Sequence, residues 1–120
     1  MSTETQTSVR YERDADGIVT LTLDDPNQSA NTMNELYRES MAAAVERLYA
    51  EQDDITGVVI TSAKKTFFAG GDLKLMVQTT KENAGDVFAQ CEGIKASLRR
   101  LELFPKPVVA AINGAALGGG

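Results

Sequence analysis

The stretch Phe67-Phe68-Ala69-Gly70-Gly71-Asp72-Leu73-Lys74 decides the fold, because it marks a turn from a strand into a helix. An apolar run typical of a strand precedes it, and a helical pattern follows. The two adjacent glycines have no Cβ, so a ligand can approach their backbone N–H groups closely. Asp72 is a suitable N-cap for the helix, whose first turn carries partial positive charge. The stretch is therefore suited to hold a developing negative charge.

A second glycine-rich turn, Asn113-Gly114-Ala115-Ala116-Leu117-Gly118-Gly119-Gly120, follows another apolar run. Either turn alone has an ordinary explanation: a strand-to-helix loop for the first, and a flexible end or a helix C-cap for the second. A phosphate-binding loop is a further alternative, because helix N-termini bind anions. Neither turn contains Gly-x-x-x-x-Gly-Lys-Ser/Thr or Gly-x-Gly-x-x-Gly, however. If the N–H groups of Gly71 and Gly119 point at one oxygen, they would polarise a carbonyl and stabilise an enolate-like anion.

Composition limits the classes of function that this chain can have. With 120 residues and 42% hydrophobic content, it can form one domain with one core. The net charge of −5 argues against binding to nucleic acid or to anionic membranes. No apolar run approaches the ~20 residues that span a bilayer, and the polar start does not resemble a secretory signal. A single cysteine cannot form an internal disulfide, which favours a cytoplasmic location.

The sequence contains no histidine, and this excludes several catalytic mechanisms. A Ser–His or Cys–His nucleophilic pair cannot form from this chain alone. Cys91 without histidine cannot supply the ligands that zinc needs, so we expect no metal site. Catalysis would have to use carboxylates, lysines or backbone dipoles.

Strand and helix patterns alternate along the chain after a polar tail at residues 1–7, so residues 8–120 are expected to form the folded unit. Such alternation predicts an α/β fold with right-handed crossovers and a largely parallel inner sheet. The first long helix is expected to be capped by Asn31 or Thr32, and Cys91 to pack in the core from the second. The expected elements are a hairpin at 8–13 and 18–23, a helix at 33–52, a buried strand at 57–61, a brief helix at 73–77, a helix with an apolar stripe at 87–101, and a buried strand at 108–112.

Three segments, residues 18–23, 67–74 and 107–120, strongly resemble the enoyl-CoA hydratase/isomerase (crotonase) family. The likeness covers nearly everything from Val9 onward, and it is closest to the hydratase domain that begins the α subunit of the fatty-acid β-oxidation multienzyme. The resemblance implies a crotonase-like ββα spiral, of which residues 8–120 form the N-terminal part.

The resemblance also assigns roles to single residues. Gly71 and Gly119 are similar to the two oxyanion-hole donors for the acyl thioester carbonyl, and are the expected catalytic groups. Other positions resemble contacts to coenzyme A, although the alternatives are an N-cap for Asp72 and plain surface charge for the lysines. The expected coenzyme A-binding residues are Ala30, Lys65, Ala69, Gly71, Asp72, Leu73, Lys74, Gly118 and Gly119.

The implied reaction is syn hydration of a 2-trans-enoyl-CoA. In the family, two glutamates position water and move protons; here both are expected beyond Gly120, so the chain alone is expected to be inactive. Hydration needs no cofactor besides the coenzyme A of the substrate, and NAD is expected only for a 3-hydroxyacyl-CoA dehydrogenase elsewhere in the parent protein. Expected partners are the acyl-CoA thioester, further copies of the protein and a thiolase β subunit. Alternatives are a non-catalytic acyl-CoA-binding or interaction module, and another reaction of the family such as enoyl-CoA isomerisation.

Overall fold

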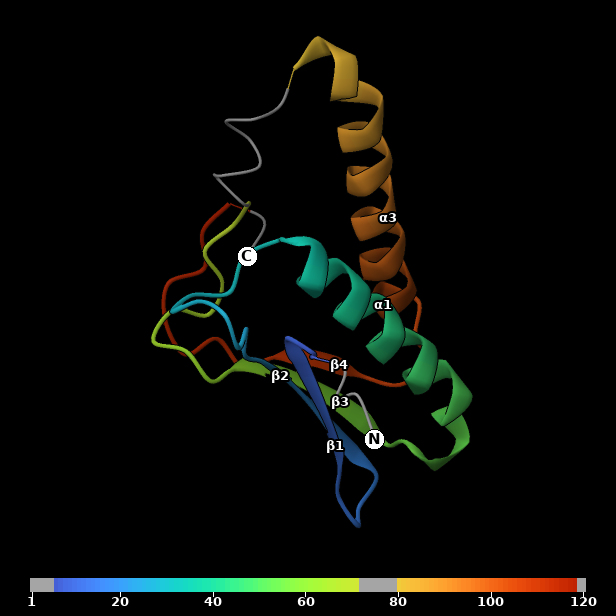
Figure 1. Ribbon diagram of the computed structural model, residues 1–120. Helices are drawn as coiled ribbons and strands as arrows, with labels where there is room; N and C mark the ends of the chain where they lie inside the picture. Colours follow the sequence, from blue (N-terminus) through green and yellow to red (C-terminus); the bar gives the residue numbers. More distant parts are fainter. Residues whose placement is uncertain (1–5, 72–79, 119–120) are drawn as a thin grey trace, which may run out of the picture.

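The computed structural model describes residues 6–71 and 80–118, and within them a four-stranded sheet carries two helices on one side (Figure 1). The strand order is β1-β2-β3-β4. The brief helix expected at 73–77 and the first five residues of the expected tail lie outside the described residues. Neither described helix is long and apolar enough to cross a membrane.

The first two strands form the predicted hairpin. β1 (Val9–Arg13) pairs antiparallel with β2 (Ile18–Leu23). Asp14 organises the turn, because its carboxylate accepts the backbone N–H groups of Asp16 and Ile18, each at 2.9 Å. The hairpin prediction is therefore confirmed.

The inner strands are parallel, as predicted from the alternation of strands and helices. β3 (Gly57–Ser62) pairs in parallel with β2 on one side and with β4 (Val108–Ala110) on the other. Two details of the prediction are wrong. The middle of β3 is only half-buried, and β4 is shorter and more exposed than expected, with 58% exposure at Val109 and 61% at Ile112. The reason is that β4 is an edge strand and that α1 and α3 both lie on the same side of the sheet, which leaves its other face uncovered by helices (Figure 1).

Helix α1 (Glu35–Ala50) confirms the first predicted helix, with shorter bounds. Its cap is Asn34, whose side chain accepts the N–H of Tyr37 at 2.9 Å, so the expected cap at Asn31 or Thr32 is wrong. One face of α1 meets the sheet, and Leu48 there is completely buried together with Val19 and Leu21 of β2. This face holds α1 on the sheet, in which β3 and β4 lead into the glycine turns.

Helix α3 (Ala84–Glu102) also confirms a predicted helix, but not the burial of its apolar stripe. Among its described residues only Leu101 is buried, while Phe88 is 67% exposed and Cys91 is exposed. The helix touches the sheet layer with its C-terminal end, and the rest extends away from the sheet (Figure 1). The prediction that Cys91 packs in the core is therefore wrong.

Candidate functional site

The two glycine-rich segments lie side by side at the carboxyl ends of β3 and β4. Phe67 and Phe68 donate their backbone N–H groups to the carbonyl of Ala115, at 2.9 and 3.2 Å, and Leu117 donates to the carbonyl of Phe68 at 2.9 Å. Phe68 and Ala116 form an isolated parallel bridge. The structure thus brings together the two segments that the sequence singled out.

Glycine is required where these segments meet. Gly70 has φ +88° and Gly118 has φ +56°, a backbone conformation that strains side chains. A Cβ on Gly70 would lie 3.1 Å from the carbonyl oxygen of Leu117, and one on Gly118 would lie 3.3 Å from the Cα of Gly70. The sequence suggested that these glycines let a ligand approach the backbone closely. The structure shows that they also let the two turns pack against each other.

The loop before α1 borders the first glycine turn. Ala69 donates its N–H to the carbonyl of Asn31 at 2.7 Å, and Met33 donates to the carbonyl of Gly70 at 2.8 Å. Gly71 is half-buried, and no described residue accepts a hydrogen bond from its N–H.

The side chain of Asn31 joins the loop before α1 to β2, to β3 and to the first glycine turn by hydrogen bonds. Its side chain, 3% exposed, donates to the carbonyls of Leu23 and Phe67, at 3.0 and 3.3 Å, and to the hydroxyl of Ser62 at 2.9 Å. Its oxygen accepts the N–H of Asp25 at 2.9 Å. The sequence reasoning missed this role. The only signal was an asparagine shortly after a strand, which is equally typical of a helix cap.

Asn113 and Gly114 attach the second turn to the segment that leads from β3 into the first turn. The amide of Asn113 donates to the carbonyls of Ser62 and Lys64, at 3.2 and 2.9 Å. A Cβ on Gly114 would overlap the carbonyl oxygen of Lys65, so the chains can pass only with glycine at this position. These two positions were also missed as organising residues.

Two neighbouring lysines near the turn differ in their surroundings. Lys64 forms an ion pair with Asp24 at 3.0 Å and donates to the carbonyl of Asp25 at 2.8 Å, so its ammonium is already bound inside the protein. Lys65 is exposed. Of this pair, Lys65 is the side chain that can reach an anionic ligand, which is the position that the sequence singled out.

The remaining predicted site residues fall into two groups. Ala30 and Ala69 are half-buried, in the loop before α1 and in the first turn, and Gly118 is exposed beside Gly70. Residues outside the described part of the chain are Asp72, Leu73, Lys74 and Gly119. The meeting of Gly71 and Gly119 at one oxygen therefore stays a prediction.

An apolar cavity of about 160 Å³ opens beside the first turn. Phe67 and Phe68 line it together with Tyr37 and Met41 from α1. The rings of Tyr37 and Phe68 pack edge to face, with centroids 5.1 Å apart, and burial raises the pKa of Tyr37 to about 12. A ligand that presents an oxygen to Gly71 could place an apolar group here. Within residues 6–71 and 80–118, no group of three or more His, Cys, Asp or Glu side chains could hold a metal ion.

Solved structures of other proteins share this fold. The chain superposes on an enoyl-CoA hydratase from Bacillus anthracis with a TM-score of 0.81 and 29% identity, covering 95% of this chain and 43% of that one. It superposes on DspI from Pseudomonas aeruginosa with a TM-score of 0.78 and 28% identity, covering 99% of this chain and 43% of that one. The predicted crotonase-like α/β fold is therefore confirmed.

Sequence comparison gives the same relationship. The fatty acid oxidation complex subunit alpha of Idiomarina loihiensis is 39% identical over 106 residues, and that of Psychrobacter cryohalolentis is 37% identical over 105. Each match covers 88% of this chain, which spans only 14% of the length of these relatives. A sequence model described as enoyl-CoA hydratase/isomerase matches residues 13–120. This chain belongs to the enoyl-CoA hydratase/isomerase family.

Proposed function

We propose that this chain binds an acyl-CoA thioester and stabilises negative charge on its carbonyl oxygen, as part of an enoyl-CoA hydratase of fatty-acid β-oxidation. The observation that carries the proposal is the contact between the two glycine turns, in which Phe68 bonds to Leu117 and Gly70 packs against Gly118. Their neighbours in sequence, Gly71 and Gly119, would donate their N–H groups to the thioester oxygen. Backbone donors of this kind stabilise a transition state by about 2.7–4 kcal/mol each.

The remaining coenzyme A contacts are proposed from position. Lys65, exposed beside the turn, would meet a phosphate, and Lys74 would do the same from the segment after it. Ala69 would present its carbonyl oxygen to the adenine, because its N–H is already bonded to Asn31. Ala30, Asp72, Leu73 and Gly118 would line the same cleft. The apolar cavity beside Phe68 would take the acyl group.

The chemistry requires an acid–base pair besides these donors. With the thioester polarised, the oxygen of a water molecule bonds to the β-carbon as a carboxylate takes the water's proton, and a protonated carboxyl group delivers a proton to the α-carbon. We propose that the two family glutamates follow Gly120 in the complete protein. The parent protein would be cytoplasmic and would combine this hydratase with an NAD-dependent 3-hydroxyacyl-CoA dehydrogenase and a thiolase β subunit.

The direct test of the proposed function is binding of butanoyl-CoA to the purified chain by calorimetry, with free coenzyme A and acetyl-CoA as comparisons. The proposal requires binding that is stronger for the thioester with the longer apolar group. Binding of none of the three would overturn it. Hydration of crotonyl-CoA by the complete hydratase domain tests the reaction, and a folded domain that leaves crotonyl-CoA unchanged would favour the alternative of a non-catalytic binding module. Isomerisation of a 3-enoyl-CoA by the same domain would favour the isomerase alternative.

A further inference from the structure

Asn113 and Gly114 form a chemically labile dipeptide at the start of the second glycine turn. The backbone nitrogen of the residue after an asparagine can attack the asparagine Cγ, and the attack is easiest when that residue is glycine, which has no side chain to hinder the approach. All other asparagines of this chain are followed by residues with side chains. Asn113 and Gly114 are both exposed, so water can reach them. Spontaneous deamidation is therefore expected here before it is expected at any other asparagine of the chain.

The fold requires both members of this dipeptide. The side-chain nitrogen of Asn113 carries two hydrogens, and it donates to the carbonyls of Ser62 at 3.2 Å and of Lys64 at 2.9 Å. A Cβ on Gly114 would overlap the carbonyl oxygen of Lys65. The contact that attaches the second turn to the segment after β3 thus also creates the labile dipeptide.

The same contact opposes the reaction. Attack on Cγ brings the side chain back onto the backbone nitrogen of Gly114, and this movement has to break both hydrogen bonds of the amide. The backbone is held on either side as well, because Ala111 donates its N–H to the carbonyl of Ile60 at 2.7 Å and the carbonyl of Ala115 accepts the N–H of Phe67 at 2.9 Å. The reaction therefore requires that the second turn first detach from the segment after β3.

We propose that Asn113 is a modification site that becomes reactive when the second turn detaches, and that its deamidation then keeps the two glycine turns apart. The nitrogen of Gly114 loses its proton and bonds to Cγ of Asn113, the bond between Cγ and the side-chain nitrogen breaks, and ammonia leaves with that proton. Water then opens the cyclic imide at either of its carbonyls, giving aspartate or isoaspartate at position 113.

Neither product fits the contact. The carboxylate of aspartate has no hydrogen to donate at neutral pH, so its oxygens would face the carbonyl oxygens of Ser62 and Lys64. In isoaspartate the backbone runs through the side-chain carbon, and the added methylene displaces Ala115 from its bond with Phe67. Separation of the turns would also remove acyl-CoA binding, and only this last consequence rests on the proposed function.

The first experiment follows deamidation of the full chain by peptide mass spectrometry, in mildly alkaline buffer with and without enough urea to unfold it. Asn113 should react at least about tenfold more slowly in the folded chain, because the detached turn lacks the hydrogen bonds of the amide and is rare. Asn83, which is followed by alanine, is the internal control and should react more slowly than Asn113 in urea. Equal rates at Asn113 with and without urea, or an Asn113 that stays intact in urea, would overturn the proposal.

The second experiment uses Asn113→Asp, which reproduces one product, and measures hydrogen exchange. The N–H of Leu117, which bonds across the turns to Phe68, should exchange at least about tenfold faster than in wild type. The N–H of Thr56, bonded at 2.8 Å to the carbonyl of Gly17 where β2 and β3 begin, should exchange as in wild type. Unchanged exchange at Leu117, or an equal increase at Thr56, would overturn the local separation of the turns.

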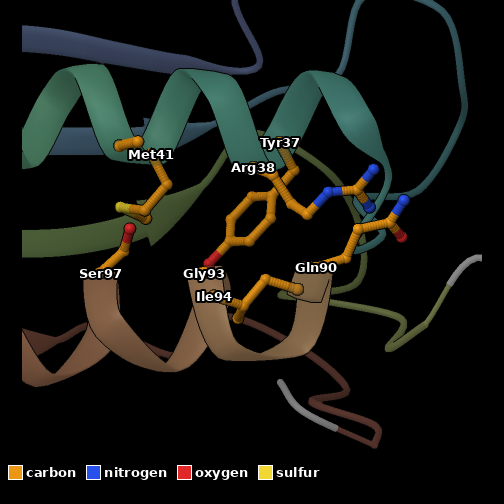
Figure 2. A pocket seen from close by; sticks show the side chains of 8 residues that line it. Tyr37, Arg38, Met41, Gln90, Gly93, Ile94 and Ser97 are labelled. Atoms are coloured by element: carbon orange, nitrogen blue, oxygen red, sulfur yellow. The ribbon is translucent and has the colours of Figure 1, made fainter. Parts of the chain in front are cut away.

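Gln90→Glu is the matched control for the added charge. It makes the same change of amide to carboxylate on α3, where Figure 2 shows the side chain of Gln90 near the guanidinium of Arg38. Because a carboxylate is well placed beside a guanidinium, this variant should leave the exchange of Leu117 unchanged. An increase as large as that in Asn113→Asp would mean that charge alone, and no lost donor, loosens the turns.

Binding of butanoyl-CoA separates this inference from the proposed function. If wild type binds it, Asn113→Asp should weaken binding at least about tenfold, and Gln90→Glu should not. Wild-type affinity in Asn113→Asp would overturn the loss of the acyl-CoA site through deamidation. If wild type binds no butanoyl-CoA, the proposed function fails, whereas exchange at Leu117 still decides whether deamidation separates the turns.

Discussion

Leu117 donates its backbone N–H to the carbonyl of Phe68 at 2.9 Å, and this bond joins two segments that are far apart in the sequence. Immediately beyond it, Gly118 lies against Gly70. Parallel strands end at the same edge of a sheet, so the turns that follow β3 and β4 are neighbours for topological reasons. What the bond adds is register, because it determines which residues of the two turns face each other.

The first prediction concerns the contact at Gly70. Gly70→Ala should destabilise the chain by about 1–3 kcal/mol, because the new Cβ is strained at φ +88° and lies 3.1 Å from the carbonyl oxygen of Leu117. Butanoyl-CoA binding should weaken as well. Urea unfolding and calorimetry measure the two effects. Gly85→Ala, at an unobstructed helical position, is the control, and should be neutral or stabilising by up to about 1 kcal/mol. Equal stability of the two variants would contradict the steric argument.

The second prediction concerns the buried amide of Asn31. Asn31→Ala should cost about 2–4 kcal/mol in the free energy of unfolding, because it removes the acceptor of the Asp25 N–H and the amide donor to the carbonyls of Leu23 and Phe67. Asn27→Ala is the control: that side chain is exposed and, among the described residues, bonds only to Gln6, so its loss should cost less than about 0.5 kcal/mol. Similar midpoints of urea unfolding for the two variants would show that Asn31 does not organise the loop.

The sequence was sufficient for the four described strands, for α1 and α3, and for their order. Periodicity located the hairpin, α1 and α3, and the strand–helix alternation predicted the parallel pairing of β2, β3 and β4. Burial was predicted less well. The stripe on α3 has the spacing of a core face, yet Phe88 is exposed, because spacing identifies an apolar side without showing what covers it.

The contact between the two turns could be predicted from the sequence because glycines mark it. Gly70, Gly71 and Gly118 could be identified, because two adjacent glycines after a strand are an unusual local pattern. Asn31 and Asn113 could not, since their bonds run to Ser62 and other residues distant in sequence. An asparagine is common in any loop, and only the folded chain distinguishes a cap from an amide that joins three segments.

The third prediction is a change of stability at high pH. Burial raises the pKa of Tyr37 from 10.0 to about 12, so between these values the unfolded chain releases a proton that the folded chain keeps. The contribution of Tyr37 is fully present below pH 10 and is lost as the pH rises towards 12, at up to about 1.4 kcal/mol per pH unit. Tyr37→Phe keeps the ring beside Phe68 and should show a shallower decline between pH 10 and 12 in urea unfolding. Parallel declines for variant and wild type would contradict the assignment.

The fourth prediction tests the core under α1. Leu48 is 0% exposed, so Leu48→Ala should destabilise the chain by about 2–5 kcal/mol through lost burial and the cavity that remains. Leu103, which is 59% exposed, gives the control: Leu103→Ala should change the free energy of unfolding by less than about 0.5 kcal/mol. Urea unfolding measures both free energies. A larger loss of stability in Leu103→Ala than in Leu48→Ala would contradict the described packing.

The last prediction isolates the amide of Gly71. Gly71→Pro removes the N–H that the proposed function assigns to the thioester oxygen, and no hydrogen bond from this N–H to a described residue is lost with it. Butanoyl-CoA has the carbonyl that this amide would polarise, whereas S-butyl-CoA, a thioether, has none. Wild type should therefore prefer the thioester by about 3–10-fold, the value of one hydrogen bond, and the variant should lose most of this preference. In the complete hydratase domain the same change should lower the rate of crotonyl-CoA hydration by about 10²–10³-fold. A variant that weakens both ligands equally would mean that Gly71 shapes the turn without contacting the thioester oxygen.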